Sequence, residues 1–234
     1  MSESVRDWNS QPPYDYADYR STALRAPTRK LVALRHGLSE RTGPVFGDES
    51  VVPGDSDLTH NGRVNGEPVG ERIIVTGRVV DEDGRPVRSA LVEVWQANAA
   101  GRYVHSDDRH DAPLDPNFLG AGRAVTDQDG RYRFVTIRPG AYPWGNHRNA
   151  WRPPHIHFSL LGPTIASRLV TQIYFPGDPL LAFDPIYLGA PAGARERMVA
   201  AFSPDVTSEG FALGYEWDIV LRGRGETPVE GQGR

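Results

Sequence analysis

Two histidines stand one residue apart in the stretch WRPPHIHF, which runs from Trp151 to Phe158. In an extended segment the side chains of His155 and His157 point to the same face, with Cα atoms about 6.6 Å apart. That separation lets two imidazoles converge on one ion. Ile156 and Phe158 supply the apolar face of the same strand, and the preceding prolines stiffen its approach. The pair by itself is as compatible with a metal site as with two packing or surface histidines.

Several metals fit the pair alone. A cupin-like site would need a Glu shortly after the second histidine, and residues 158–163 contain no acid. A non-haem Fe(II) triad would need one carboxylate, for which Asp178 and Asp184 are the nearest candidates. A zinc hydrolase could take His110 or His147 as its third ligand.

Two tyrosines beside neighbouring strands suggest another metal. Tyr103 follows the predicted strand 89–98, and Tyr142 lies in a turn-rich loop with Trp144. A phenolate is a hard anionic ligand, and a trivalent cation can lower the phenol pKa of about 10 enough to bind it at neutral pH. Two tyrosines and two histidines would suit Fe(III).

The elements that must hold these residues are short strands separated by Gly and Pro turns. Strands are predicted at 72–80, 89–98, 124–134, 155–161, 167–175 and 215–223, with turns at Asp83-Gly84 and Asp129-Gly130. The first two strands are expected to be joined as a hairpin by DEDG, and TDQDG is expected to do the same for the next pair. Only Ala194–Phe202 is expected to be helical. The pattern predicts an all-β, antiparallel β-sandwich with little helix.

Composition limits the class of protein. The chain has 234 residues, no Cys and a formal net charge of -4, with both signs interspersed. These features favour a cytoplasmic protein with N and O metal ligands, and they argue against nucleic-acid or membrane partners. Residues 1–70 are polar and rich in Pro, Gly and Tyr, which predicts an arm that packs on a partner subunit, followed by one sandwich domain at 71–234.

The chain resembles the intradiol ring-cleavage dioxygenases, and among them the beta subunits that cleave protocatechuate. The resemblance rests on VEVWQANAAGRY, APLDPNF, TIRPGAYPW, WRPPHIHFSLLGP, TQIYFPGDP and DIVLRG, with DYRSTALRAPTRKLV in the arm. It covers most of the chain and implies the prealbumin-like sandwich of that family.

The resemblance also implies the chemistry. It implies that Tyr103, Tyr142, His155 and His157 bind one Fe(III) in each beta chain, and that Tyr142 leaves the metal and accepts a proton when the substrate binds. The reaction would be the cleavage of protocatechuate (3,4-dihydroxybenzoate) by O2 to 3-carboxy-cis,cis-muconate, in the beta-ketoadipate pathway of aromatic catabolism.

Supporting roles follow from the same resemblance. Arg152 would stabilise charge on the substrate ring, with Gln172 beside it, while Trp144 and Tyr19 would contact the substrate. Trp95 is expected to pack in the core. An alpha subunit of the same fold would complete the enzyme as a hetero-oligomer.

Two alternatives remain open at this point. A catechol or hydroxyquinol 1,2-dioxygenase would use the same iron chemistry, but it would begin with dimer-forming helices that residues 1–70 do not predict. A non-catalytic β-sandwich binding module would explain the DEDG and TDQDG turns but not the tyrosines.

Overall fold

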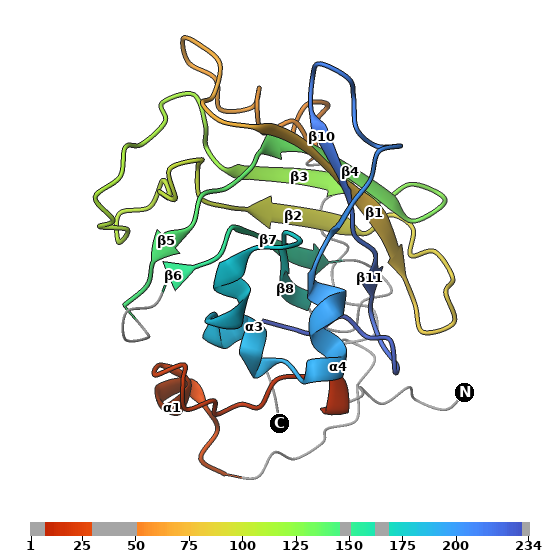
Figure 1. The fold of residues 1–234 in the computed structure, drawn as a ribbon. Helices are drawn as coiled ribbons and strands as arrows, with labels where there is room; N and C mark the ends of the chain where they lie inside the picture. Colours follow the sequence, from red (N-terminus) through yellow and green to blue (C-terminus); the bar gives the residue numbers. More distant parts are fainter. Residues whose placement is uncertain (1–7, 30–50, 146–150, 162–168, 231–234) are drawn as a thin grey trace.

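Two β-sheets pack face to face in the computed structural model, which describes residues 8–29, 51–145, 151–161 and 169–230 (Figure 1). The strands are β1 (Arg72–Val80), β2 (Leu91–Trp95), β3 (Ala121–Val125), β4 (Arg131–Ile137), β5 (Tyr142–Pro143), β6 (Trp151–Arg152), β7 (His155–Leu161), β8 (Leu169–Tyr174), β9 (Ala201–Phe202), β10 (Leu213–Glu216) and β11 (Ile219–Val220). The predicted all-β sandwich is confirmed.

The first sheet is organised around β1. In the part of the chain that the structure describes, its order is β11-β1-β10-β9, and β4 pairs with the other edge of β1. The β1–β4 pair is antiparallel, whereas β10 and β11 run parallel to successive parts of β1. The two parallel pairs of this sheet, β1–β10 and β1–β11, both involve β1, whereas the β1–β4 and β9–β10 pairs are antiparallel.

The second sheet, in the order β3-β2-β7-β8, positions the histidines. All of its pairs are antiparallel, and His157 lies opposite Trp95 on one side and Gln172 on the other. Directly paired residues project to the same face of a sheet. The register therefore brings Trp95, His157 and Gln172 together, although they are far apart in the sequence.

The Asp-Gly turns do not join paired strands, so the expected hairpins are wrong beyond the turns themselves. After Gly84 the chain returns only far enough for Val87 N–H to bond to the Val79 carbonyl. It then crosses to the other sheet, where β2 pairs with β3 and β7. The second turn likewise joins β3 of one sheet to β4 of the other.

The core between the two sheets is formed by large apolar side chains that alternate along the strands. Tyr132, Phe134, Trp217 and Ile219 are buried between the sheets, and Phe158 of β7 meets the first three in ring contacts. Ile156 and Phe158 therefore form the apolar face of β7, as their positions in the sequence predicted. Burial of this kind contributes about 1.5–3 kcal/mol for each large side chain.

Helical segments are short and lie at one end of the sandwich. They are η1 (Trp8–Ser10), α1 (Thr22–Arg25), η3 (Pro179–Ala182), α3 (Pro185–Gly189), α4 (Ala192–Arg195) and η4 (Glu196–Met198). The helix predicted at Ala194–Phe202 is wrong after Met198, because Val199 is extended and Ala200 N–H bonds to the Tyr174 carbonyl of β8. Tertiary pairing thus overrides the local preference for helix.

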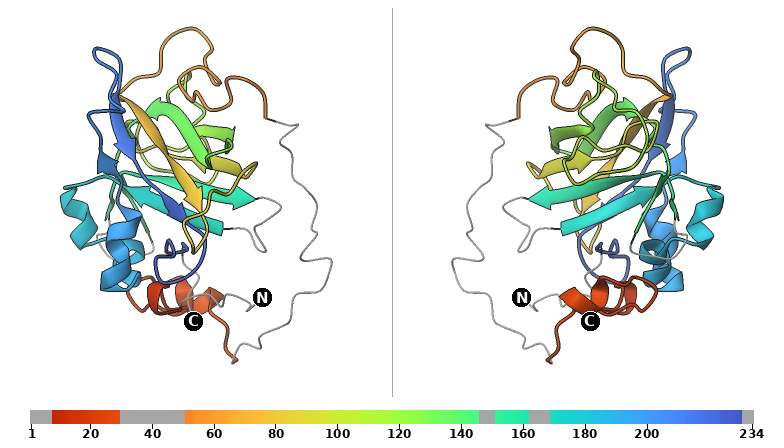
Figure 2. Two further views of the ribbon diagram at one scale, coloured as in Figure 1. Left: turned by 90° about the vertical axis from the view of Figure 1, so that its right-hand side faces the viewer. Right: turned by 90° about the vertical axis from the view of Figure 1, so that its left-hand side faces the viewer.

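The described part of the arm packs on its own chain. Leu58, which precedes the expected boundary at residue 70, is fully buried in the main core. The division of the chain at residue 70 stays a prediction. Gln11 bonds to the Val229 amide, and α1 lies at the end of the molecule that carries α3 and α4 (Figures 1 and 2). Packing of the arm on a partner subunit stays a prediction.

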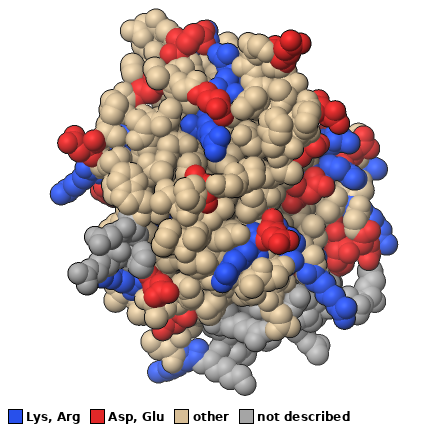
Figure 3. All heavy atoms as spheres, viewed as in Figure 1, with Lys and Arg blue, Asp and Glu red and all other residues tan. Residues whose placement is uncertain are grey.

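The surface carries charges of both signs. On the face shown in Figure 3, acidic and basic side chains lie close together among larger uncharged areas. Within the described residues, no helix has the length and apolar character needed to cross a bilayer.

Candidate metal centre

Strand β7 brings its two histidines together on the face turned away from the core. The Nε2 atoms of His155 and His157 lie 3.2 Å apart, and both side chains are buried. The face opposite carries Ile156 and Phe158, which are buried in the core cluster. Alternation along an extended strand therefore gives one face to packing and the other to the site, as predicted.

Each imidazole uses its other nitrogen for a separate hydrogen bond. His155 Nδ1 lies 2.7 Å from the Pro153 carbonyl oxygen, and His157 Nδ1 lies 2.8 Å from Glu230 Oε2. Both partners are acceptors, so a neutral imidazole must carry its proton on Nδ1. The two Nε2 lone pairs then face each other and cannot bond to each other. A cation between them would satisfy both.

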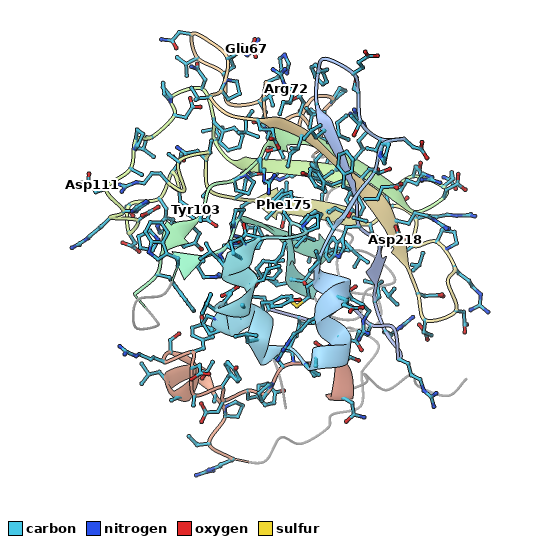
Figure 4. All side chains as sticks on the ribbon, viewed as in Figure 1. Glu67, Arg72, Tyr103, Asp111, Phe175 and Asp218 are labelled. Atoms are coloured by element: carbon cyan, nitrogen blue, oxygen red, sulfur yellow. The ribbon has the colours of Figure 1, made fainter. Side chains whose placement is uncertain are left out.

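Tyr142 and Tyr103 add two oxygens to the same place. The Tyr142 hydroxyl lies 3.3 Å from His155 Nε2, and the two phenol rings meet edge to face with centroids 5.4 Å apart. The Tyr103 hydroxyl is buried and has no hydrogen-bond partner among the described residues. Figure 4 shows Tyr103 beside β5 and β6. A buried, unpaired phenol next to two facing lone pairs fits a metal ligand.

A glycine permits this approach of the two tyrosines. Gly101 has φ 78°, and a Cβ atom there would lie 2.2 Å from the Ala141 carbonyl oxygen. Only glycine combines this backbone conformation with so close a contact. The Tyr103 backbone N–H also donates to Asp108 Oδ2 at 2.8 Å, which holds Tyr103 within the loop that follows β2.

Burial favours the uncharged forms of Tyr103, Tyr142 and His155. Burial raises the pKa of Tyr103 well above its usual value, and nearby Tyr142 raises it further. Burial also raises the pKa of Tyr142. The pKa of His155 is lowered well below its usual value by burial, then by Arg152 and His157. Phenolate ligands at neutral pH would therefore need the charge of a bound metal ion.

Arg152 lies buried beside the site in an ion pair that the sequence did not indicate. Its Nε and Nη2 donate to the two oxygens of Asp184 at 3.0 and 3.2 Å. Burial lowers the pKa of Arg152, but Asp184, together with the nearby Tyr174, Tyr142 and Glu230, raises it by more, so the guanidinium remains charged. Asp184 is fully buried and caps α3 through the Ile186 N–H. Its carboxylate is thus used on the guanidinium and not on a metal.

Gln172 extends this network towards the histidines. Its Oε1 accepts from Arg152 Nη2 at 2.8 Å, and its Nε2 is buried without a hydrogen-bond partner among the described residues. Tyr174 donates to Asp184 Oδ2 at 2.7 Å. The Gln172 amide nitrogen and the Tyr103 hydroxyl are thus two buried groups near the histidines without hydrogen-bond partners in the described part of the chain. Buried unpaired groups of this kind are typical of a ligand-binding site.

Three aromatic rings border the site. Tyr19 of the arm contacts Trp144 with ring centroids 4.7 Å apart, and the Arg152 guanidinium lies 5.3 Å from the Trp144 ring. Trp95 stacks on His157 with an interplanar angle of 2° and a centroid distance of 4.8 Å. The expected core position of Trp95 is wrong, because its register with His157 turns it to the site face.

The described residues supply no third ligand for the alternative Fe(II) or zinc sites. No group of three His, Asp or Glu side chains gathers there as a metal site. Asp178 caps η3, and His110 contacts the ring of Trp151. His147, the other zinc candidate, lies outside the described residues.

Comparisons with known proteins identify the family of the chain. A family model described as "Dioxygenase" matches residues 41–223, and one described as "Protocatechuate 3,4-dioxygenase beta subunit N terminal" matches residues 5–36. The protocatechuate 3,4-dioxygenase beta chain of Burkholderia cepacia is 66% identical over 96% of both chains. Hydroxyquinol 1,2-dioxygenase of Rhizobium sp. (strain MTP-10005) is 32% identical over 78% of this chain and 63% of that protein.

A solved structure supports the same family. The crystal structure of 3-chlorocatechol 1,2-dioxygenase from Rhodococcus opacus 1CP matches with a TM-score of 0.56 and 25% identity, over 76% of this chain and 70% of that chain. The arm model and the higher identity favour the beta chain over the 1,2-dioxygenases and over a non-catalytic module. The chain therefore belongs to the intradiol dioxygenase family and is of the protocatechuate 3,4-dioxygenase beta-chain type.

Proposed function

We propose that this chain is the iron-binding subunit of an enzyme that cleaves protocatechuate with O2 to 3-carboxy-cis,cis-muconate. The observation that carries the proposal is the set of two imidazole nitrogens and two phenol oxygens on one side of β7, with Nε2 atoms 3.2 Å apart. Two hard oxygen donors with two imidazoles match a ferric ion better than zinc or Fe(II).

The ligands would be Tyr103, Tyr142, His155 and His157, with one Fe(III) in each chain. Bound there, the ion would act as a Lewis acid and template for a catecholic substrate and would keep the tyrosines ionised. The chain contributes the geometry: β7 fixes both imidazoles, and Gly101 lets the Tyr103 loop approach β5. The Pro153 carbonyl and the Glu230 carboxylate accept from the Nδ1–H groups of His155 and His157, which leaves both Nε2 atoms free to bind the metal.

Tyr142 is the better placed of the two tyrosines to exchange with substrate. It lies in a two-residue strand that pairs only with β6 among the described elements, so less structure fixes it than fixes the β7 histidines. A catechol that binds through both oxygens releases protons. The Tyr142 oxygen would accept one of them as the phenol leaves the metal, since burial raises the pKa of this phenol.

Arg152 and Gln172 would contact the reacting part of the substrate. Nε and Nη2 of Arg152 make its hydrogen bonds to Asp184, Gln172 and Tyr174, so Nη1 is left to face a substrate oxygen. The buried guanidinium would stabilise negative charge that develops on the ring during oxygen attack. Gln172 Nε2 would supply a second, neutral donor at the same end of the site.

Trp144 and Tyr19 would form the wall that selects a carboxylated ring. Trp144 offers an aromatic face against Arg152, and the Tyr19 hydroxyl would donate to the substrate carboxylate. Tyr19 lies within residues 5–36, which match the N-terminal model of protocatechuate 3,4-dioxygenase beta subunits. If Tyr19 selects substrates with a carboxylate, this role would explain why protocatechuate 3,4-dioxygenase beta subunits carry such an arm.

An alpha subunit would complete the enzyme. The printed name of the Burkholderia cepacia protein, a beta chain, supports a partner of this kind. The site is also flanked by exposed apolar side chains: Val104, next to Tyr103, is 56% exposed, and Trp151, next to Arg152, is 46% exposed. Apolar groups exposed beside a catalytic site are typical of a surface that another chain covers.

The test is substrate-dependent oxygen uptake by the iron-loaded chain purified with its partner subunit. Protocatechuate should support stoichiometric O2 consumption and formation of 3-carboxy-cis,cis-muconate, and should exceed catechol and hydroxyquinol in kcat/KM. Faster turnover of catechol or hydroxyquinol would contradict the proposed substrate. Cleavage outside the two hydroxylated carbons would contradict the proposed reaction.

A further inference from the structure

A carboxylate from the C-terminal segment meets the second histidine of the site. Glu230 Oε2 lies 2.8 Å from His157 Nδ1, and the two residues are 73 positions apart in the sequence. His155 differs, because its Nδ1 partner is the neutral carbonyl of Pro153. Only one of the two imidazoles therefore has an anionic partner among the described residues.

The segment that carries Glu230, residues 226–230, is held at several points, and we call it the C-terminal strap. Thr171 of β8 donates to the Pro228 carbonyl at 2.6 Å, and the Glu230 N–H donates to the Val170 carbonyl at 2.8 Å. The Val229 N–H donates to Gln11 Oε1 of the arm, also at 2.8 Å. The strap is thus fixed between the arm and the edge strand of the sheet that carries the site.

Trp95 and Glu230 fix the His157 ring in two ways. Trp95 stacks parallel to the ring and sets its plane. Glu230 accepts a hydrogen bond from the Nδ1–H group and so fixes the rotation of the ring within that plane. The Nε2 lone pair of His157 then points towards His155 and Tyr142. A carboxylate acceptor also makes the imidazole a more electron-rich donor than a carbonyl acceptor does.

We propose that Glu230 is a positioning residue for His157, which sets the tautomer and donor strength of that ligand. The inference rests on the proposed iron site and assigns an unequal strength to its two histidines. It also gives the arm and the strap a function in metal binding, because Gln11 helps to hold the strap that carries Glu230.

The test compares Glu230→Ala and Glu230→Gln with a control, Glu216→Gln, an exposed carboxylate on β10 of the other sheet. Each is measured in the purified assembly by iron affinity against a competing chelator and by the visible tyrosinate-to-iron charge-transfer band. Glu230→Ala should lose about 10- to 100-fold in iron affinity. Its band should move to longer wavelength, since a weaker histidine donor leaves the iron a stronger Lewis acid.

Glu230→Gln separates positioning from charge. The amide oxygen still accepts from Nδ1, so iron affinity should stay within about 10-fold of the wild type. The band should still shift to longer wavelength, because the negative charge is lost. Glu216→Gln should change neither property.

Two results would overturn the proposal. One is an unshifted band in both Glu230 variants, and the other is an equal change in Glu216→Gln. If Glu230→Ala does not fold, the Glu230→Gln band decides alone. A wild-type assembly without iron or colour would instead overturn the proposed function, so the two failures are distinguishable.

Discussion

Tyr103 carries a hydroxyl that is buried without a hydrogen-bond partner among the described residues. An unpaired buried polar group destabilises a fold by about 1–3 kcal/mol. In the metal-free chain this cost is present, whereas in the iron-bound chain the oxygen would be a ligand. The same atom should therefore oppose folding and support function.

We expect Tyr103→Phe to stabilise the metal-free chain by about 1 kcal/mol and to weaken iron binding strongly. Tyr132→Phe is the matched control, since the Tyr132 hydroxyl donates to the Trp217 carbonyl at 2.6 Å in the core. That variant should lose about 1–2 kcal/mol and keep the iron. Urea unfolding and iron analysis measure both effects. A loss of stability in metal-free Tyr103→Phe would contradict the unpaired hydroxyl.

The Arg152–Asp184 pair is the second test at this scale. The side chains are 3% and 0% exposed, so removal of one charge leaves the other buried and uncompensated. Asp184→Asn should cost about 3 kcal/mol of folding free energy and should lower kcat by displacing the guanidinium. Asp83→Asn, in the exposed pair with Arg85, should cost less than about 1 kcal/mol. Equal effects in urea unfolding would show that the Asp184 pair is not buried in solution.

The residue types of the site were predictable, but the residues that support them were not. The His-x-His spacing and the two tyrosines have recognisable chemistry, and the structure brings all four side chains together. Asp184 and Glu230 lie 32 and 73 positions from their partners in segments without periodicity. Only the folded chain reveals such contacts, because no local pattern links a loop carboxylate to a distant strand.

At the scale of elements, the arm is the part whose position has the most direct consequence for function. Tyr19 touches Trp144 at the border of the site, although residues 8–29 precede the sandwich by a long stretch of chain. Aromatic pairs contribute about 0.5–1.5 kcal/mol beyond their buried area. Loss of the ring should therefore act on substrate binding and leave the metal ligands unchanged.

Tyr19→Ala should raise KM for protocatechuate by about 2- to 10-fold, with kcat and the charge-transfer band nearly unchanged. Leu24→Ala on α1 is the control, because Leu24 is 90% exposed in the same arm. Steady-state kinetics and the visible spectrum measure the two variants. A fall in kcat with an altered band would instead place Tyr19 among the groups that act on the metal.

Strand positions were largely predictable, whereas strand pairing was not. In β4, Tyr132 and Phe134 alternate with Arg131 and Arg133, a pattern that indicates which face of the strand is buried. It did not identify the partner, because an Asp-Gly turn is compatible both with a hairpin and with a crossing between sheets. The register of Trp95 with His157 was hidden for the same reason.

At the scale of the whole molecule, buried phenols make stability depend on alkaline pH. Burial raises the pKa of Tyr132 well above 10.0, and Asp218 raises it further. Burial and then Asp184 do the same for the pKa of Tyr174. Above pH 10 the unfolded chain releases these protons while the folded chain retains them, so stability should fall as pH rises.

Each such group should contribute a slope of about 1.4 kcal/mol per pH unit between its unfolded and folded pKa values. Tyr132→Phe should remove the contribution of Tyr132 to this slope in the metal-free chain. The slope should decrease whatever effect the substitution has on stability at neutral pH. Urea unfolding at a series of pH values above about 9 measures the slope. An equal slope in the wild type and the variant would contradict the buried titration of Tyr132.

The visible spectrum of the purified, iron-loaded assembly reports directly on the proposed ferric site. Tyrosinate bound to Fe(III) absorbs visible light by charge transfer, so the protein should be burgundy to red, with one iron for each beta chain. Anaerobic protocatechuate should shift the band as Tyr142 leaves the metal, and Tyr142→Phe should alter the band before substrate is added. A colourless protein that gains no band on reconstitution with Fe(III) and its partner subunit would contradict the ferric site of Tyr103, Tyr142, His155 and His157.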